Sequence, residues 1–107
     1  MSKITLSYKE KEYTLEYNRQ SVRMMESQGF VIDQISEKPA TMIPQLFGGA
    51  FIKNHRGLKR AFVDEIYDET IDKNGLINAL MEMYVETLST LTEDKEEEGN
   101  AIWAVVK

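Results

Sequence analysis

Residues 3–17 read KITLSYKEKEYTLEY, and apolar and polar side chains alternate within them in two runs. Alternation of this kind is typical of a β-strand with one buried face. Because both runs bring their apolar side chains to one side, they predict an antiparallel hairpin. A lone hairpin is only marginally stable in water, so we expect helices to cover its apolar side.

A turn at residues 10–11 gives the register that brings the apolar residues of the two runs face to face. Tyr8 then lies opposite Tyr13, and Lys9 lies opposite Glu12 as a cross-strand pair of opposite charge. The turn dipeptide, Glu-Lys, is not one that the primed turns of two-residue hairpins favour. A longer loop is therefore an open alternative.

The segment after the hairpin predicts a short helix over residues 19–28. Asn18 precedes it as an N-cap, and Gly29 follows it where a left-handed C-terminal cap belongs. Asp33 is a candidate cap for one further helical turn. That turn must end before Pro39, because the residue before a proline avoids helical geometry.

Residues 41–54 predict the next helix, with Thr41 as its N-cap. Pro44 then falls in the first turn, where its missing N–H is no loss. The pair Gly48-Gly49 lies inside the helix and costs roughly 1 kcal/mol per glycine relative to alanine. We therefore expect another part of the backbone to approach the helix closely at this pair.

Two longer helices complete the predicted fold. Apolar residues recur at helical spacing over residues 58–71, and a Lys-Asn-Gly turn at 73–75 separates them from a helix over 76–91. The last helix carries two adjacent apolar stripes, so more than one of its sides must be covered. It is therefore either central in the domain or in contact with another chain.

The C-terminal residues differ from the rest of the chain. Residues 93–98 are mostly acidic, and residues 101–106 form a short apolar run with the composition of a strand. This run either joins the hairpin as a third strand or docks on a neighbouring chain. We predict a single α+β domain over residues 1–92, with an N-terminal antiparallel hairpin of two or three strands packed on four to five helices. An acidic linker and apolar tail follow over residues 93–107.

The composition of the 107 residues excludes several classes of protein. There is no cysteine and a single histidine, which rules out disulfide scaffolds, thiol catalysis and metal sites rich in Cys or His. No apolar run is long enough to cross a membrane, and the N-terminus lacks the apolar region of a signal peptide. We expect no membrane partner and a reducing, cytoplasmic location.

Charge is unevenly distributed along the chain. Residues 1–60 hold 10 Lys/Arg against 6 Asp/Glu, and residues 61–107 hold 3 against 12. This asymmetry indicates either solvated helix faces with an acidic tail or head-to-tail association of copies. The basic cluster at residues 53–60 lacks aromatic residues, and the whole chain is acidic, so we do not expect nucleic acid as a partner.

Two patterns resemble metal sites. Residues 70–77 are similar to a calcium-binding EF-hand loop, but Thr70 stands at its first position and Met81 at its last, where carboxylates are needed. Residues 64–72 place carboxylates four apart on a helix, without a basic or nucleophilic partner. We therefore predict no catalytic residue, no cofactor and no metal, and an interaction protein in place of an enzyme.

Apolar side chains on two helices and in the tail are the candidates for contacts with a partner protein. The same periodicity is also typical of core residues, so both interpretations are open for each of them. The candidates are Phe47, Phe51, Met81, Tyr84, Val85, Ile102 and Trp103.

Six segments of the chain carry a family resemblance: EYTLEY (12–17), KPATMIPQLFGGAF (38–51), NH (54–55), DEIY (64–67), LMEMY (80–84) and GNAIW (99–103). Together they resemble a largely uncharacterised family of small proteins from prophages and long-tailed phages of Gram-positive bacteria. Its members are similar in size, acidity and order of elements to phage tail assembly chaperones, which keep the apolar tape measure protein soluble while the tail tube polymerises around it.

The resemblance implies a function in binding. We expect a tail assembly chaperone-like protein of the bacterial host cytoplasm, with the tape measure or another tail protein as its partner, and a homo-oligomer is a further possibility. Two alternatives stay open. One is a structural virion component, such as a connector or tail-completion subunit. The other is a prophage regulator that binds nucleic acid through residues 53–60.

Overall fold

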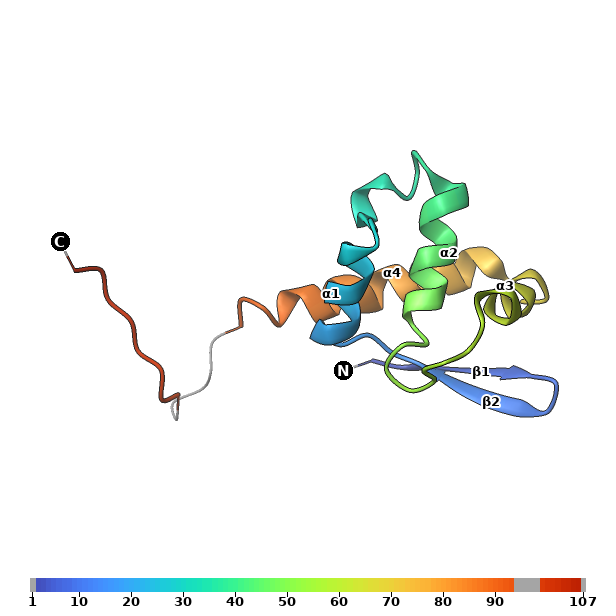
Figure 1. Ribbon diagram of the computed structural model, residues 1–107, viewed down its shortest axis with the longest axis horizontal. Helices are drawn as coiled ribbons and strands as arrows, with labels where there is room; N and C mark the ends of the chain where they lie inside the picture. The colour runs from blue at the N-terminus through green and yellow to red at the C-terminus, as the bar shows by residue number, and fades with distance from the viewer. Residues whose placement is uncertain (1, 94–98, 107) are drawn as a thin grey trace.

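The computed structural model describes residues 2–93 and 99–106 and has an α+β architecture (Figure 1). Within these residues a two-stranded antiparallel hairpin precedes four α-helices, which confirms the predicted fold class. The elements are β1 (Ile4–Tyr8), β2 (Lys11–Leu15), α1 (Arg19–Ser27), the 3₁₀ turn η1 (Ile32–Gln34), α2 (Pro39–Gly49), α3 (Arg60–Asp68) and α4 (Lys73–Ser89).

The register of the hairpin differs from the predicted one by two residues. Ile4 lies opposite Leu15, and Tyr8 lies opposite Lys11 and not opposite Tyr13. A shift by two residues leaves every side chain on the face that alternation assigns to it. The prediction of faces is therefore confirmed, while the prediction of cross-strand pairs is wrong.

The hairpin turn explains this register. Lys9 and Glu10 form a two-residue loop with φ of 50° and 65°. Positive φ at both central residues is the geometry of a type I′ turn, whose twist matches that of the two strands. Lys9 consequently lies near Glu65 of α3, with Nζ 3.5 Å from the carboxylate, and not opposite Glu12.

A single core joins the hairpin to the helices. The central element is α2, which packs against α1, α3 and α4, while the apolar face of β2 closes the core from the side of the hairpin (Figure 1). Burial of these side chains removes apolar surface from water and is the main source of stability. The largest fully buried side chains are Leu15, Tyr17, Met25, Leu46, Phe47, Ile66, Leu80 and Tyr84.

The helix α1 begins and ends as predicted. The Asn18 side chain accepts a hydrogen bond from the backbone N–H of Ser21, and the Ser21 hydroxyl accepts one from the N–H of Asn18, so the two form a capping box. Gly29 follows the helix with φ of 93°. This left-handed conformation is the one that glycine adopts without a steric penalty.

The helices α2 and α4 begin earlier than predicted. Pro39 is the first residue of α2, in the position where proline is preferred, so Pro44 lies inside the helix and not in its first turn. The helix α4 begins at Lys73, because the Asp72 carboxylate caps it by accepting the N–H of Gly75 at 3.1 Å. The predicted turn at 73–75 is therefore the first turn of this helix.

The apolar tail does not extend the hairpin of its own chain. Residues 99–106 contain no helix or strand, and the sheet formed by the described residues has the order β1-β2. Figure 1 shows the tail leading away from the folded body. The predicted third strand is therefore absent from the described part of this chain, and residues 94–98 of the predicted acidic linker lie outside it.

Candidate protein-binding groove

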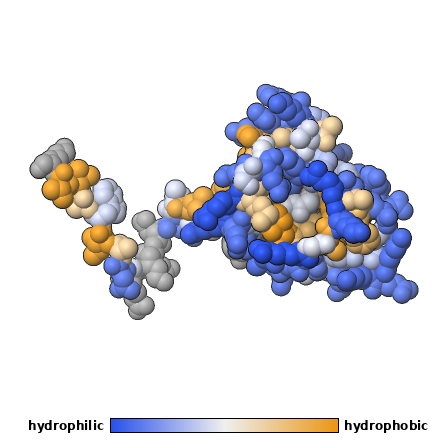
Figure 2. Space-filling model, in the orientation of Figure 1, coloured by the Kyte–Doolittle hydropathy of each residue, from blue (hydrophilic) through white to orange (hydrophobic). Residues whose placement is uncertain are grey.

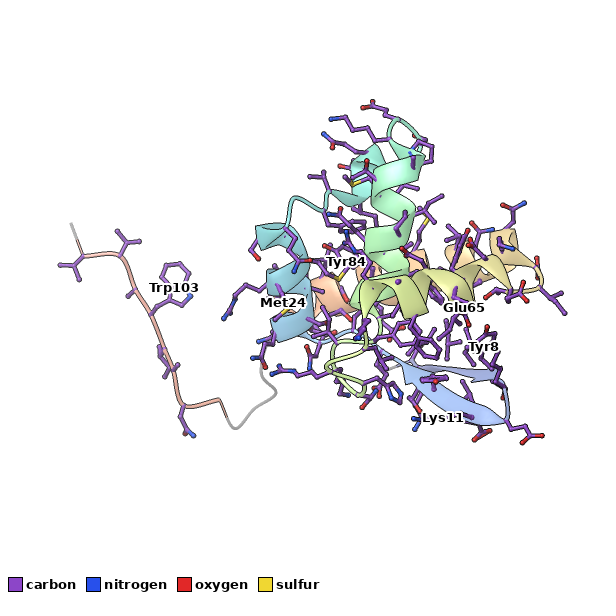
Figure 3. The ribbon with its side chains drawn as sticks, turned by 45° about the vertical axis from the view of Figure 1, so that its right-hand side comes forward. Tyr8, Lys11, Met24, Glu65, Tyr84 and Trp103 are labelled. Carbon is purple, nitrogen blue, oxygen red and sulfur yellow. The ribbon has the colours of Figure 1, made fainter. Side chains whose placement is uncertain are left out.

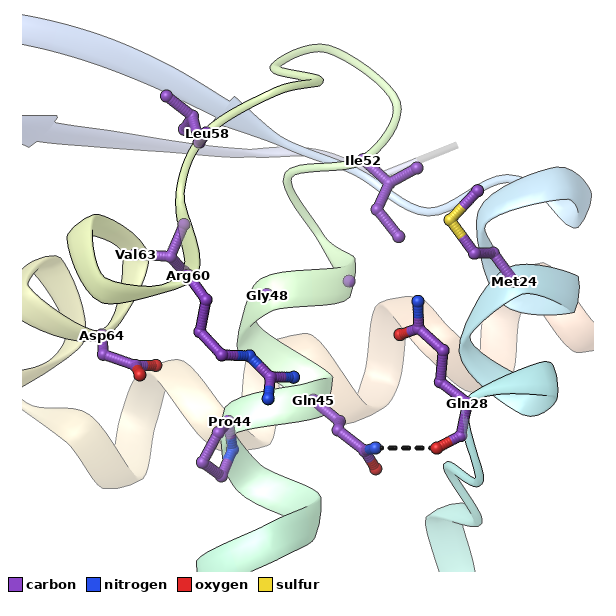
Figure 4. A pocket seen from close by; sticks show the side chains of 11 residues that line it. Met24, Gln28, Pro44, Gln45, Gly48, Ile52, Leu58, Arg60, Val63 and Asp64 are labelled. Carbon is purple, nitrogen blue, oxygen red and sulfur yellow. Dashed lines mark hydrogen bonds between the residues drawn. The ribbon is translucent and has the colours of Figure 1, made fainter.

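A hollow of about 200 Å³ lies where α1, α2 and α3 meet (Figure 4). Met24 of α1 and Val63 of α3 stand on opposite sides of it, and Ile52 and Leu58 come from the connection between α2 and α3. Met24 is 38% exposed, although it is a large apolar side chain. The hollow therefore combines apolar side chains with the polar side chains of Gln28, Gln45, Arg60 and Asp64.

The hollow continues along α2 in both directions. Toward the start of α2, a second hollow of about 500 Å³ shares Pro44 and Asp64 with the first and reaches Ile43 and Tyr67. Toward the end of α2, a third hollow, with a volume of about 270 Å³, shares Met24 with the first hollow. We call the three together the α2 groove. Figure 2 shows one face of the folded body, on which apolar side chains lie exposed among hydrophilic ones.

The two adjacent glycines of α2 have different roles in the groove. A Cβ at Gly48 would have no neighbouring atom within 4 Å, so this glycine leaves the floor of the groove open. A Cβ at Gly49 would collide with the side chain of Met25 from α1. The predicted close approach is therefore present, but a side chain and not another backbone makes it.

Pro44 lies at the centre of the groove, since it lines both the first and the second hollow. Proline lacks the N–H that would bond to the carbonyl four residues earlier in a helix. The carbonyl of Ala40 therefore has no such helical donor, and Ala40 itself lines the second hollow. An exposed helix surface with a weakened hydrogen-bond ladder thus borders the groove.

Polar and charged side chains line the groove beside the apolar ones. The Gln45 amide donates through Nε2 to the carbonyl of Gln28 at 3.0 Å, which joins the end of α1 to α2 (Figure 4). Its other atom, Oε1, is buried and accepts no hydrogen bond from the described residues. Arg60 and Asp64 add one charge of each sign on the α3 side. The groove therefore combines apolar walls with charged margins.

Tyr67 lies at the α3 end of the groove, where it packs edge to face on Phe47 with ring centroids 5.3 Å apart. Burial raises the pKa of the Tyr67 phenol, and the nearby Asp68 carboxylate raises this pKa further. Both effects disfavour the phenolate, so this phenol stays a neutral hydrogen-bonding group at the margin of the groove.

Three of the predicted partner-binding residues lie in the core. Phe47 and Phe51 are 1% and 2% exposed and pack edge to face on each other, and Tyr84 is 2% exposed and packs on Phe30. Helical periodicity marks the side of a helix that is covered, but it does not distinguish cover by the same chain from cover by a partner. Phe47 and Phe51 nevertheless line the second and third hollows, whereas Tyr84 lines none of the three. Contact of these residues with a partner stays a prediction.

The other four predicted residues are accessible to different degrees but do not line the groove. Met81 is partly buried against the core, and Val85 on α4 is 53% exposed. Ile102 and Trp103 lie in the tail and are 93% and 82% exposed. Apart from Phe47 and Phe51, the predicted residues do not line the groove, because its lining comes from several elements that no local pattern brings together. The further signals in the sequence were Pro44 and the glycine pair.

Two of the five basic residues in the predicted cluster at 53–60 are engaged in contacts with the hairpin. Lys53 forms an ion pair with Glu16 at 2.8 Å, and His55 accepts the N–H of Thr14 through Nε2 at 2.9 Å. The hydrogen bonds of Glu16 with Lys53 and then with Asn54 lower the pKa of its carboxyl. These contacts fasten the connection between α2 and α3 to the outer edge of β2.

Within residues 2–93 and 99–106, no three His, Asp or Glu side chains gather closely enough to hold a metal ion. None of the helices described combines the length and the apolar character that a membrane crossing requires. The carboxylates of residues 64–72 therefore form no cluster of the kind that a cation site needs.

The fold defines a small α+β protein in which a hairpin closes one side of a four-helix core. The chain belongs to the family described as Domain of unknown function (DUF5055), which matches residues 1–106. Membership of an uncharacterised family, as the resemblance implied, is thus confirmed. In two further comparisons, no curated protein and no solved structure matched the chain.

Proposed function

We propose that this protein is a phage tail assembly chaperone-like protein that holds an apolar helix of the tape measure protein, or of another tail protein, in the α2 groove. The observation that carries the proposal is the groove itself, which keeps apolar side chains such as Met24 and Ile52 at the surface around an open floor at Gly48. The protein acts by binding and performs no catalysis.

The groove has the form that a helix-in-groove complex requires. In such complexes, apolar side chains spaced three and four residues apart on one helix enter an apolar groove of the other protein. The walls supplied by α1 and α3 lie on either side of α2, so a helix laid along α2 would contact both.

Charge adds to the selectivity of the proposed complex. Asp64 and Asp68 line the groove, and Arg56 and Arg60 line it as well. A partner helix that places Lys or Arg near the two carboxylates and Asp or Glu near the two guanidinium groups would be complementary to this lining. The family resemblance supports the phage origin, and tail assembly would place the complex in the cytoplasm of the bacterial host.

Co-expression with the tape measure protein of the same phage or prophage tests the proposal. We expect the tape measure protein to become soluble and to co-purify with this chain. Met24→Glu places a charge in the groove and should reduce the co-purified amount by about tenfold or more. Ile71→Glu places the same charge on an exposed apolar position between α3 and α4 outside the groove, and this matched control should retain the complex.

Other outcomes separate the alternatives. A tape measure protein that stays insoluble would refute the chaperone proposal, and recovery of this chain from purified particles would then favour a structural virion component. If both variants lose the same amount of co-purified tape measure protein, the groove is not the binding site. Salt-sensitive binding to DNA that Lys59→Glu/Arg60→Glu abolishes would favour the regulator.

A further inference from the structure

The strand β1 forms an open edge of the hairpin. Thr5 lies opposite Thr14, and Thr14 turns its N–H and C=O away from β1, toward His55 and Asn54. In an antiparallel ladder, two directly opposed residues either exchange hydrogen bonds through their backbone N–H and C=O groups, or both turn these groups away from the strand pair. Thr5 and, two residues on, Ser7 therefore direct their N–H and C=O groups out of the hairpin. Within residues 2–93 and 99–106, these groups form no hydrogen bond outside the strand pair.

The other edge of the hairpin is closed at Thr14 and Glu16. The N–H of Glu16 donates to the carbonyl of Ala50 at 3.0 Å, and the His55 and Asn54 side chains bond to the N–H and C=O of Thr14 at 2.9 and 3.2 Å. Proteins commonly cover one edge of a sheet in this way because free edges pair with other strands. The contrast identifies β1 as the edge at which a strand can be added.

Side-chain burial points to the same edge. Tyr13 and Leu15 of β2 are 3% and 0% exposed. Ile4, Leu6 and Tyr8 point to the same face from β1 but are only partly buried. A neighbouring strand beside β1 would cover the apolar surface that these three side chains still expose.

The tail supplies a segment of matching length and chemistry. Residues 101–106 read AIWAVV, six apolar residues beside a strand of five, and they include strand-forming Ile, Trp and Val. Ile102, Trp103 and Val106 are 93%, 82% and 94% exposed, and Trp103 stands well clear of the folded body (Figure 3). Pairing with a strand would satisfy the backbone groups of this run and bring the side chains of one of its faces against the apolar face of the hairpin.

We propose that residues 101–106 of one chain add to β1 of a second copy, and that the exchange is reciprocal, so that two chains form a symmetric dimer. A second copy is the occupant because the tail lies away from β1 of its own chain. Charge favours the exchange as well. Lys3 and Lys9 flank β1, and five of the six residues in the segment 93–98 before the tail are acidic. This inference is independent of the partner proposed for the α2 groove.

The single tryptophan of the chain reports directly on this contact. The measurements are light scattering behind a size-exclusion column and Trp103 fluorescence, on the full chain from about 1 µM to about 500 µM. We expect the mass to rise from that of the 12.4 kDa monomer to twice this value as concentration increases. In the same range, the Trp103 emission should shift to shorter wavelength and become less accessible to acrylamide.

Two proline variants test whether the contact lies between β1 and the tail. Ser7→Pro removes an outward N–H from β1 without removing a bond of the hairpin ladder, and Ser7→Ala is its matched control. Val105→Pro acts on the tail, which lies outside the folded body, so it leaves the body intact. Each proline variant alone should stay monomeric, while Ser7→Ala should dimerise as the unaltered chain does. A mixture of the two proline variants combines one intact edge with one intact tail and should recover association.

Three results would overturn the proposal. A monomeric mass with an accessible Trp103 at all concentrations would exclude self-association. A monomeric mass with a shielded Trp103 would mean that the tail docks on its own chain. A dimer that survives both proline variants, with helical circular dichroism unchanged, would place the interface elsewhere.

Discussion

The hydroxyl of Tyr8 on β1 donates a hydrogen bond to the carboxylate of Glu65 on α3, with 2.5 Å between the two oxygens (Figure 3). The two residues are 57 positions apart in sequence, and the Lys9 ammonium reaches the same carboxylate oxygen at 3.5 Å. This exposed polar contact joins the tip of the hairpin to the helix that borders the α2 groove.

The contact predicts a dependence of stability on acid pH. The hydrogen bond from Tyr8, and then the charge of Lys9, lower the pKa of Glu65 below its ordinary value of 4.5. A lowered carboxyl pKa contributes stability above the pKa of the unfolded chain, and this stability is lost as pH falls through the folded value. We expect the urea midpoint to fall below about pH 4.5 and to fall less in Tyr8→Phe. Identical pH profiles for the two proteins would contradict this.

The glycine pair predicts two opposite effects of the same substitution. Gly48→Ala gains helix propensity in open space and should raise the free energy of unfolding by about 1 kcal/mol. Gly49→Ala drives a methyl group into the buried Met25, and overpacking of a core costs about 1–3 kcal/mol. Urea unfolding should give Gly48→Ala a higher free energy of unfolding than the unaltered chain, and Gly49→Ala a lower one. Equal stabilisation by both would show that Met25 moves aside freely.

The start of α4 predicts a difference between two replacements of Asp72. This residue has φ of 58° and accepts the N–H of Gly75 through its side chain. Asparagine accepts the same hydrogen bond and tolerates the left-handed conformation, so Asp72→Asn should be nearly neutral. Asp72→Ala loses the cap and should cost about 1–2 kcal/mol in thermal or urea unfolding. A neutral alanine variant would show that the cap contributes little.

Tyr17 predicts a dependence on alkaline pH. Its hydroxyl donates to the carbonyl of Leu46 at 2.6 Å inside the core, and burial raises the pKa of the phenol well above its ordinary value of 10.0. A raised phenol pKa contributes stability that is present below the unfolded value and is lost as pH rises through the folded value. In a spectroscopic titration, this phenol should ionise only as the protein unfolds.

Tyr17→Phe provides the control for that titration. It removes the donor to Leu46 and should cost about 1–2 kcal/mol at neutral pH, because the buried carbonyl loses its partner. The absorbance step that coincides with alkaline unfolding should be smaller by one phenol. A full-sized step in the variant would assign the late ionisation to another tyrosine.

The hairpin and the helices could be predicted from the sequence because alternation and helical spacing directly report which face of an element is covered. The pairing of Tyr8 with Lys11 could not, since a shift of two residues leaves all faces unchanged. The early start of α2 was missed because both Pro39 and Thr41 are acceptable at a helix start, and only the packed structure chooses between them.

For the candidate site, the sequence indicated its location on α2 but not most of the residues that line it. Phe47 and Tyr84 carry the strongest apolar signals of their helices and for that reason lie in the core. Met24, Ile52 and Val63 meet only after the chain has folded, and none of them stands out locally. The glycine pair and Pro44 did mark the place, because residues that disfavour a regular helix are retained where a neighbour or an opening requires them.

The closed outer edge of β2 limits how far these molecules can grow by adding strands. With His55, Asn54 and the carbonyl of Ala50 occupying that edge, a hairpin can accept a strand beside β1 but cannot pass the pairing on through its other side. Fibrous aggregation by stacked sheets needs two free edges on every unit. Strand addition through the hairpin therefore ends at the dimer and does not continue into a chain of copies.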